Sequence, residues 1–104
     1  MTATLVYVTA GSHDEALRIG RAAVEERLAA CANVLAPMTS VYHWEGAVQE
    51  DAEVPLVLKT RADLVERLTE RIKALHGYTC PCVVALPIQG GNPAFLDWIA
   101  EETR

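Results

Sequence analysis

The residues best suited to chemistry lie near position 80, where Cys80 and Cys82 flank a proline and His76 precedes Cys80 by four residues. Two thiols and an imidazole so close together are ligands for soft metals such as copper(I), or for zinc. A closed zinc site needs four ligands, and the CxxC pairs of a strong zinc signature are absent from the sequence. Residues two apart in an extended segment point the same way, so both thiols can equally lie in the core. Burial, redox chemistry and a metal site at His76, Cys80 and Cys82 therefore remain open.

The other reactive side chains do not form a recognisable catalytic set. No nucleophile can be paired with a base by its spacing, so neither a Ser-His-Asp nor a Cys-His arrangement is predicted. Cys31 is expected at the end of a helix, where we interpret it as a buried thiol. An acidic cluster at Glu50, Asp51 and Glu53 is interpreted as a solvated flank of a hairpin. We therefore do not expect an enzyme.

Length and charge narrow the class of protein. The chain has 104 residues, which fits a single domain spanning 1–104. Its net charge of −5 opposes binding to nucleic acid, and its apolar runs are too short to cross a membrane. The odd count of three cysteines, with no secretory signal at the start, favours reduced thiols and a cytoplasmic location.

The elements that position these residues can be predicted from apolar spacing. The run 5–9 is typical of a buried strand, and Ser12 with Glu15 forms a capping box that begins a helix over 13–30. Alternating residues over 34–60, with a turn at Glu45-Gly46, predict a long β-hairpin. Prolines cannot donate to a ladder, so we expect bends, bulges or edge positions at Pro37 and Pro55.

The second half of the chain repeats the pattern of helix and strand. Thr60 and Asp63 resemble a helix start, and Gly77 is expected to end that helix. A strand over 83–86 follows, and Asn92 then begins a last helix whose inward-facing residues are Phe95, Leu96 and Ile99. The order βαββαβ plus a C-terminal helix predicts an α+β, ferredoxin-like fold with an antiparallel sheet.

The length of the hairpin bears on assembly. A hairpin of this length would project beyond helices of ordinary length, leaving Tyr42, Trp44 and Val48 with little of their own chain to pack against. Exposed apolar edges are usually covered, so we expect partner subunits to cover them. The alternative is that the C-terminal helix, with Trp98, covers them within one chain.

Several motifs together resemble one family, the CutA divalent-ion tolerance proteins. The similarity extends in order over nearly the whole chain, and its most specific parts are the Tyr-x-Trp-x-Gly hairpin and the Ala-Leu-Pro segment. The matching stretches are ACAN at 30–33, TSVYHWEG at 39–46, EDAE at 50–53, KT at 59–60, HGY at 76–78, ALPI at 85–88, GN at 91–92 and LDWI at 96–99.

The resemblance implies a ferredoxin-like fold, a tight homotrimer with strands paired between subunits, and an architecture close to that of the PII signalling proteins. In family members described as copper-binding, a cysteine aligns with Val8 and a His-His pair aligns with Leu75 and His76. Only His76 is present here, and Cys80 and Cys82 are hypothesised to replace the lost ligands.

Two functions follow from the resemblance. The first is tolerance of divalent metal ions, copper in particular, through binding of the metal; copper is the one cofactor that the resemblance suggests. The alternative is a PII-like signalling or binding module, with clefts between subunits for a small molecule. Such a cleft is expected to include Tyr42, Trp44, Lys59 and Tyr78.

Overall fold

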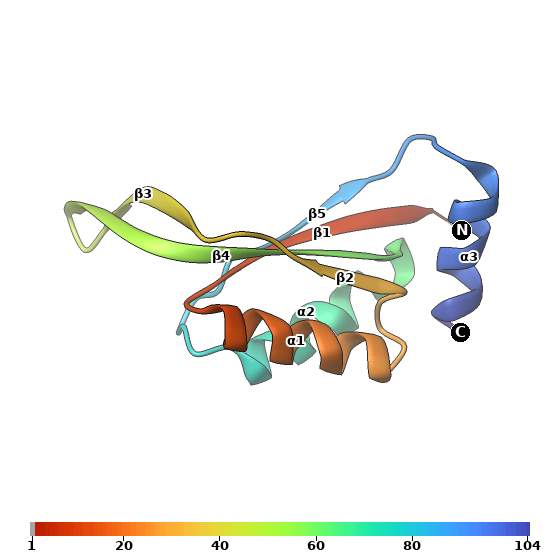
Figure 1. The fold of residues 1–104 in the computed structure, drawn as a ribbon, viewed down its shortest axis with the longest axis horizontal. Helices are drawn as coiled ribbons and strands as arrows, with labels where there is room; N and C mark the ends of the chain where they lie inside the picture. Colours follow the sequence, from red (N-terminus) through yellow and green to blue (C-terminus); the bar gives the residue numbers. More distant parts are fainter. Residues whose placement is uncertain (1) are drawn as a thin grey trace.

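The fold combines one antiparallel sheet with three helices (Figure 1). The computed structural model describes residues 2–104. In chain order, the elements are β1 (Ala3–Ala10), α1 (His13–Glu25), β2 (Cys31–Val34), β3 (Met38–Trp44), β4 (Ala47–Arg61), a 3-10 turn (Ala62–Leu64), α2 (Val65–Leu75), β5 (Val83–Pro87) and α3 (Pro93–Glu102).

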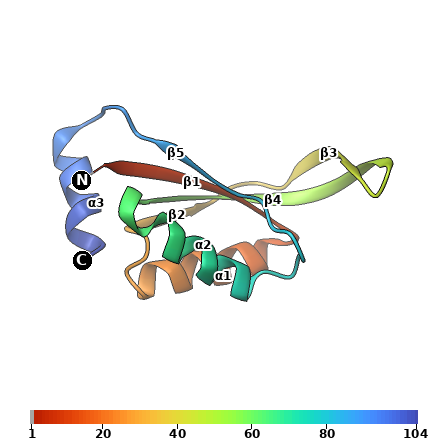
Figure 2. The ribbon, with the colours of Figure 1, turned by 180° about the vertical axis from the view of Figure 1, so that it is seen from behind.

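The sheet has the strand order β2-β4-β1-β5, and β3 pairs with the projecting half of β4. Helices α1 and α2 cover one face of the sheet, as the view from behind also shows (Figure 2). The core between helices and sheet is made of fully buried aliphatic side chains, among them Val6, Val8, Ile19, Leu56, Leu58, Leu68 and Ile72. These observations confirm the predicted α+β, ferredoxin-like arrangement with an added C-terminal helix.

The long hairpin has a bulge at Pro37 and Pro55, where a bend, bulge or edge position was predicted. Val34 pairs with Leu56 and Met38 pairs with Glu53, so three residues of one arm, 35–37, lie opposite two residues of the other, 54–55. This extra residue is a β-bulge, and it separates β2 from β3. At the tip, Glu45 and Gly46 have φ values of 50° and 78°, as a two-residue hairpin turn requires.

The first helix ends earlier than its apolar spacing predicted. It ends at Glu25 rather than at residue 30, because Arg27 adopts a left-handed conformation with φ 59°. Leu28 and Ala29 both donate to the carbonyl of Ala23 and remain buried, which keeps the apolar pattern beyond the helix. Cys31 is therefore the first residue of β2, half-buried, and not the end of a helix.

Two further local predictions were wrong, and a third holds in position only. Thr60 does not cap a helix, because it lies in β4 and its hydroxyl donates to the carbonyl of Leu28 at 2.7 Å. Gly77 directly follows His76, the C-cap of α2, as expected of a glycine that ends a helix, but it lacks the positive φ of a left-handed cap. Phe95 does not face inward; it is exposed, whereas Ile99 is fully buried on α3.

The tip of the hairpin extends beyond the helices (Figure 1). On it, Val41 and Val48 are each 65% exposed and Trp44 is 48% exposed. Helix α3 lies at the opposite end of the sheet in both ribbon views, so it does not cover these side chains within one chain (Figure 2). None of the helices within residues 2–104 is long and apolar enough to cross a membrane.

Candidate functional site

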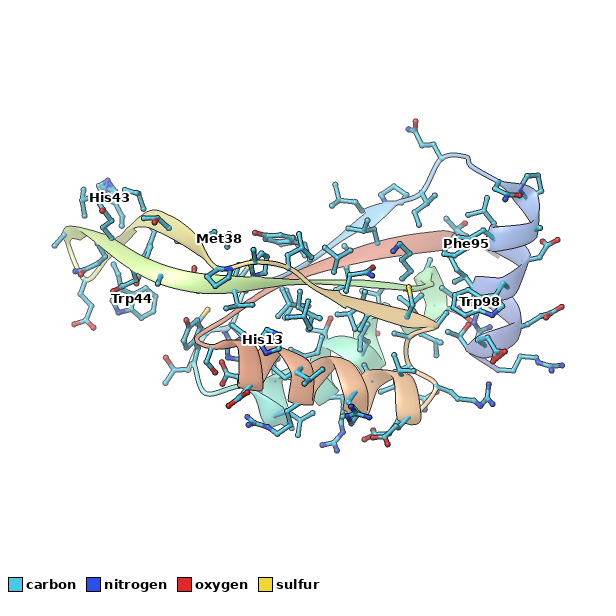
Figure 3. All side chains as sticks on the ribbon, in the orientation of Figure 1. His13, Met38, His43, Trp44, Phe95 and Trp98 are labelled. Atoms are coloured by element: carbon cyan, nitrogen blue, oxygen red, sulfur yellow. The ribbon has the colours of Figure 1, made fainter. Side chains whose placement is uncertain are left out.

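One face of the β3–β4 hairpin forms the first wall of a cleft. Residues directly opposite in an antiparallel pair lie on the same face, and alternate residues share it. The register pairs Ser40 with Asp51 and Met38 with Glu53, so Ser40, Tyr42, Trp44 and Glu53 all point to one side. Figure 3 shows His43 and Trp44 pointing to opposite sides of the hairpin, as this alternation requires.

The second wall is the segment that follows α2. The Glu15 carboxylate holds it in place, because one oxygen accepts from the Gly11 N–H and the other from the Gly77 N–H, both at 2.8 Å. A side chain at Gly77 would bring its Cβ within 2.8 Å of that second oxygen and would push the carboxylate aside. Burial opposes the ionisation of Glu15, but the two backbone hydrogen bonds outweigh it and hold the pKa of the carboxyl below its ordinary value.

The cleft between these walls has a volume of about 450 Å³. Small-molecule sites commonly enclose about 300–1,000 Å³ with mainly apolar and aromatic walls, so the cleft has the size and lining of a ligand site. It is lined by Thr9, Ser40, Tyr42, Trp44, Glu53, Tyr78, Thr79, Cys80 and Cys82. The structure thus brings three of the four predicted cleft residues together with both predicted thiols.

Two tyrosines in the cleft are bonded to carboxylates. The Tyr78 hydroxyl donates to Glu53 at 3.0 Å, and the Tyr42 hydroxyl donates to Asp51 at 2.5 Å. Burial, reinforced by the bond to Glu53, raises the pKa of Tyr78 to about 12. The hydrogen bond to Asp51 raises the pKa of Tyr42 above its ordinary value. Both phenols therefore stay neutral near physiological pH and act as hydrogen-bond donors.

The three predicted metal ligands differ in their availability. Cys80 is exposed and Cys82 is half-buried, and both line the cleft. His76 is buried; its Nδ1 accepts from the Tyr78 N–H at 3.0 Å, so its Nε2 carries the proton that it shares with the Thr9 carbonyl at 2.7 Å. Among residues 2–104, the structure assembles no group of three His, Cys, Asp or Glu side chains suited to holding a metal ion.

Lys59 lies apart from the other predicted cleft residues. It stands six positions after Glu53 on β4, which is about 20 Å at the usual rise of a strand. Its ammonium donates to Asn33 Oδ1 at 2.7 Å and lies 6.0 Å from the ring centroid of Phe95. Phe95 belongs to the end of the molecule opposite Trp44 (Figure 3).

Sequence reasoning missed the most polar part of the cleft. Glu53 was interpreted as a solvated flank, yet it is half-buried and bonded to Tyr78. The alternation within the predicted hairpin carried this signal, because a register set by the Glu45-Gly46 turn places Glu53 on the face of Tyr42. The contribution of Thr9 depends on the pairing of β1 with β4, for which local sequence gives no signal.

Comparisons with known proteins agree on one family. Residues 4–102 match the family model described as CutA1 divalent ion tolerance protein. The "Divalent-cation tolerance protein CutA" of Thermus thermophilus is 50% identical over 99 residues, covering 95% of this chain and 96% of the relative. A chloroplastic CutA 1 of Oryza sativa is 47% identical over 96% of this chain, which spans only 56% of that relative's length.

Solved structures give the same result. The crystal structure of CutA1 from Oryza sativa superposes with a TM-score of 0.96 at 45% identity, covering 100% of this chain and 95% of the other. The Thermus thermophilus structure has a TM-score of 0.95 at 48% identity, covering 98% and 99%. The name of the Archaeoglobus fulgidus structure calls that protein periplasmic. None of these relatives bears the name of an enzyme. Sequence, fold and comparisons together show that the chain belongs to the CutA1 divalent ion tolerance protein family.

Proposed function

We propose that this CutA protein supports divalent-cation tolerance by binding copper through the thiols of Cys80 and Cys82. One observation carries the proposal: both thiols line the same cleft, and Cys80 is exposed to solvent. Thiolates are soft ligands that select copper(I), which does not need the four-ligand cage of a structural zinc site. The role is one of binding and handling the ion, not of catalysis.

His76 is the third candidate ligand. Its Nε2 would become a ligand atom only by giving up the hydrogen bond to the Thr9 carbonyl. Metal binding through His76 would therefore require the imidazole to move away from the Thr9 carbonyl. Cysteine thiols bind metal only while they are reduced. We therefore propose a location in the cytoplasm, which is a reducing compartment.

A copper(I) titration against a competing chelator tests this function. The reduced, metal-free protein is compared with the double variant Cys80→Ser, Cys82→Ser and with the matched control Cys31→Ser, whose thiol lies in β2 away from the cleft. We expect the double variant alone to lose tight binding, and His76→Gln to weaken binding only if the imidazole joins the site. Unchanged affinity in the double variant would remove the thiols from the site.

We also propose that the chain assembles as a homotrimer. The support is the apolar surface of the projecting hairpin, where Val41 and Val48 are each 65% exposed, together with the open edge strands β2 and β5. Light scattering after size exclusion should give the trimer mass for the parent and a lower mass for Val41→Glu. The control Ala74→Glu, which adds the same charge at an exposed position on α2, should remain trimeric. A monomeric parent protein would refute the trimer.

A second function, small-molecule binding of the PII type, is favoured by a different observation. The cleft has aromatic side chains from both of its walls, Tyr42 and Trp44 from the hairpin and Tyr78 from the segment after α2. Rigid aromatic walls with a few polar groups are typical of sites that bind small organic molecules. A ligand of this kind would raise the melting temperature of the metal-free protein, because it binds only the native state.

A further inference from the structure

The cleft has an unusual distribution of charge. In the part of the chain that the structure describes, its lining includes one carboxylate, Glu53, and no lysine, arginine or histidine. Its polar groups are otherwise the hydroxyls of Thr9, Ser40 and Thr79, two phenols and two thiols. An anionic metabolite would therefore meet a carboxylate without any cationic partner, which disfavours phosphates and carboxylic acids as ligands.

Two further carboxylates lie behind this lining. Asp51 accepts the hydrogen bond of the Tyr42 hydroxyl, and Glu15 lies close enough to Tyr78 to oppose its ionisation. Arg18 lies near Glu15 and donates to the Leu75 carbonyl, but it does not line the cleft. Within one subunit, the charged groups that line the cleft or lie directly behind it are therefore carboxylates, and such groups favour a cation.

The aromatic walls decide which kind of cation fits. A hard ion such as Ca²⁺ takes six to eight oxygen ligands, and Glu53 alone supplies too few. Organic ammonium ions instead bind against the faces of tryptophan and tyrosine, with tryptophan the strongest partner. The Trp44 indole N–H is already engaged with the Glu45 carboxylate at 3.0 Å. The indole therefore contributes its ring face to the cleft rather than a hydrogen bond.

We propose that this cleft binds a small organic ammonium ion, with its charged head between the ring of Trp44 and the carboxylate of Glu53. The proposal deepens the second function above, on which it rests, because it names the chemical class of the ligand. The neutral phenols of Tyr42 and Tyr78 and the hydroxyl of Ser40 complete the site as walls and hydrogen-bond partners for a polar tail.

A matched pair of probes tests the proposal on the parent protein. Choline and 3,3-dimethylbutan-1-ol have the same shape, and only choline carries a charge. Binding of each to the reduced, metal-free protein is measured by calorimetry or by tryptophan fluorescence. Choline should bind at least about tenfold more tightly than the neutral alcohol, because only the cation gains from the aromatic face and the carboxylate. Equal affinities, or no binding of choline, would overturn the proposal.

Two variants then test whether Trp44 and Glu53 cause the preference for choline. Trp44→Leu removes the ring while keeping an apolar side chain, and Glu53→Gln removes the charge while keeping the shape. Each should weaken choline binding about fivefold or more and leave the neutral alcohol unaffected. Trp98→Leu is the control, since Trp98 lies on α3 at the far end of the molecule (Figure 3). Choline affinities in Trp44→Leu and Glu53→Gln equal to that of the parent would also overturn the proposal.

The copper titration separates this proposal from the metal function. The two sites are judged by different measurements, because Cys80 and Cys82 line the cleft as well and their substitution also changes its wall. Retained copper(I) binding in Cys80→Ser, Cys82→Ser contradicts only the metal site. Equal affinities of the parent protein for choline and for its neutral analogue contradict only the ammonium site.

Discussion

The two halves of β4 differ in how far their side chains are buried. In its second half, Leu56 and Leu58 are fully buried beneath the helices. In its first half, Val48 is 65% exposed on the projecting hairpin. The bulge opposite Val54 and Pro55 separates the two halves. One continuous strand thus supplies a core at one end and an uncovered surface with a cleft at the other.

This difference indicates a division of roles. The buried half determines the stability of the fold, because its aliphatic side chains fill the space between sheet and helices. The projecting half adds little to that core, so its residues are available for assembly and for the walls of the cleft. Substitutions in the two halves should therefore affect different properties of the protein.

The largest expected effect comes from matched truncations within this one strand. Leu56→Ala should lower the free energy of unfolding by about 2–5 kcal/mol, because it leaves a cavity in the core. Val48→Ala should cost less than about 0.5 kcal/mol within a subunit, because its side chain is exposed there. Both values come from denaturant unfolding at one fixed protein concentration, since assembly would otherwise shift the transition.

Equal losses in the two variants would break the comparison, because the hairpin would then share the core's role. A large loss in Val48→Ala that disappears on dilution would instead assign the effect to contacts between subunits. The oligomeric state of each variant at the concentration used distinguishes these cases.

A smaller effect is expected at Glu15, which holds the second wall of the cleft in place. Glu15→Gln should lower the free energy of unfolding by about 1 kcal/mol at neutral pH, because one of the oxygens that accept from Gly11 and Gly77 becomes an amide donor. The pKa of Glu15 is below its ordinary value of 4.5 in the folded protein, so the contribution is present above that value. It should be lost as the pH falls through the lower, folded pKa.

Unfolding of the parent and Glu15→Gln between neutral and acid pH measures this contribution. The control Glu25→Gln changes an exposed carboxylate at the end of α1 and should match the parent throughout. A difference between the parent and Glu15→Gln that is independent of pH would show that the charge of Glu15 does not tie the two segments together.

The smallest effect concerns ionisation in the cleft. Partial removal of water from the Tyr78 hydroxyl, followed by its hydrogen bond to Glu53, raises the pKa of Tyr78 to about 12. Glu53→Gln should lower that pKa only part of the way to 10, since the burial remains. NMR titration with ring-labelled tyrosine resolves Tyr78 from the other tyrosines. Glu50→Gln, on the opposite face of the hairpin, should leave the value unchanged.

The raised pKa of Tyr78 also predicts how the free energy of unfolding changes with pH. The folded state keeps the proton of Tyr78 to higher pH than the unfolded chain, whose tyrosine titrates near 10. Its stabilising contribution is therefore full below pH 10 and lost as the pH rises from there to about 12. The loss over this window should be smaller in Glu53→Gln, and an equal loss would mean that Glu53 does not act on Tyr78.

Local chemistry predicted those parts of the fold that depend on adjacent residues. The Glu45-Gly46 turn and the Asn92 cap are confirmed, because a positive φ and a side-chain cap are decided within a few residues. Half of the Ser12–Glu15 capping box is confirmed, since Ser12 Oγ accepts from the Glu15 N–H at 3.1 Å. The Glu15 carboxylate instead reaches Gly11 and the distant Gly77, which no local pattern indicates.

The residues of the cleft, too, could be predicted only where adjacent residues decide their position. Tyr42 and Trp44 were predicted to line a cleft, and the alternation of the hairpin puts them on one face. Lys59 does not line the cleft of a single chain, and its place in a cleft between subunits stays a prediction. The position of Cys80 and Cys82 opposite the hairpin depends on the tertiary path after α2, so local spacing left burial and exposure undecided.

The most direct test of the metal site is X-ray absorption at the copper edge of the copper(I)-loaded, reduced protein. We expect two sulfur neighbours in the first coordination shell of the copper, and their loss in Cys80→Ser, Cys82→Ser. A shell made only of nitrogen and oxygen, unchanged in that variant, would contradict copper binding by the thiols of this cleft.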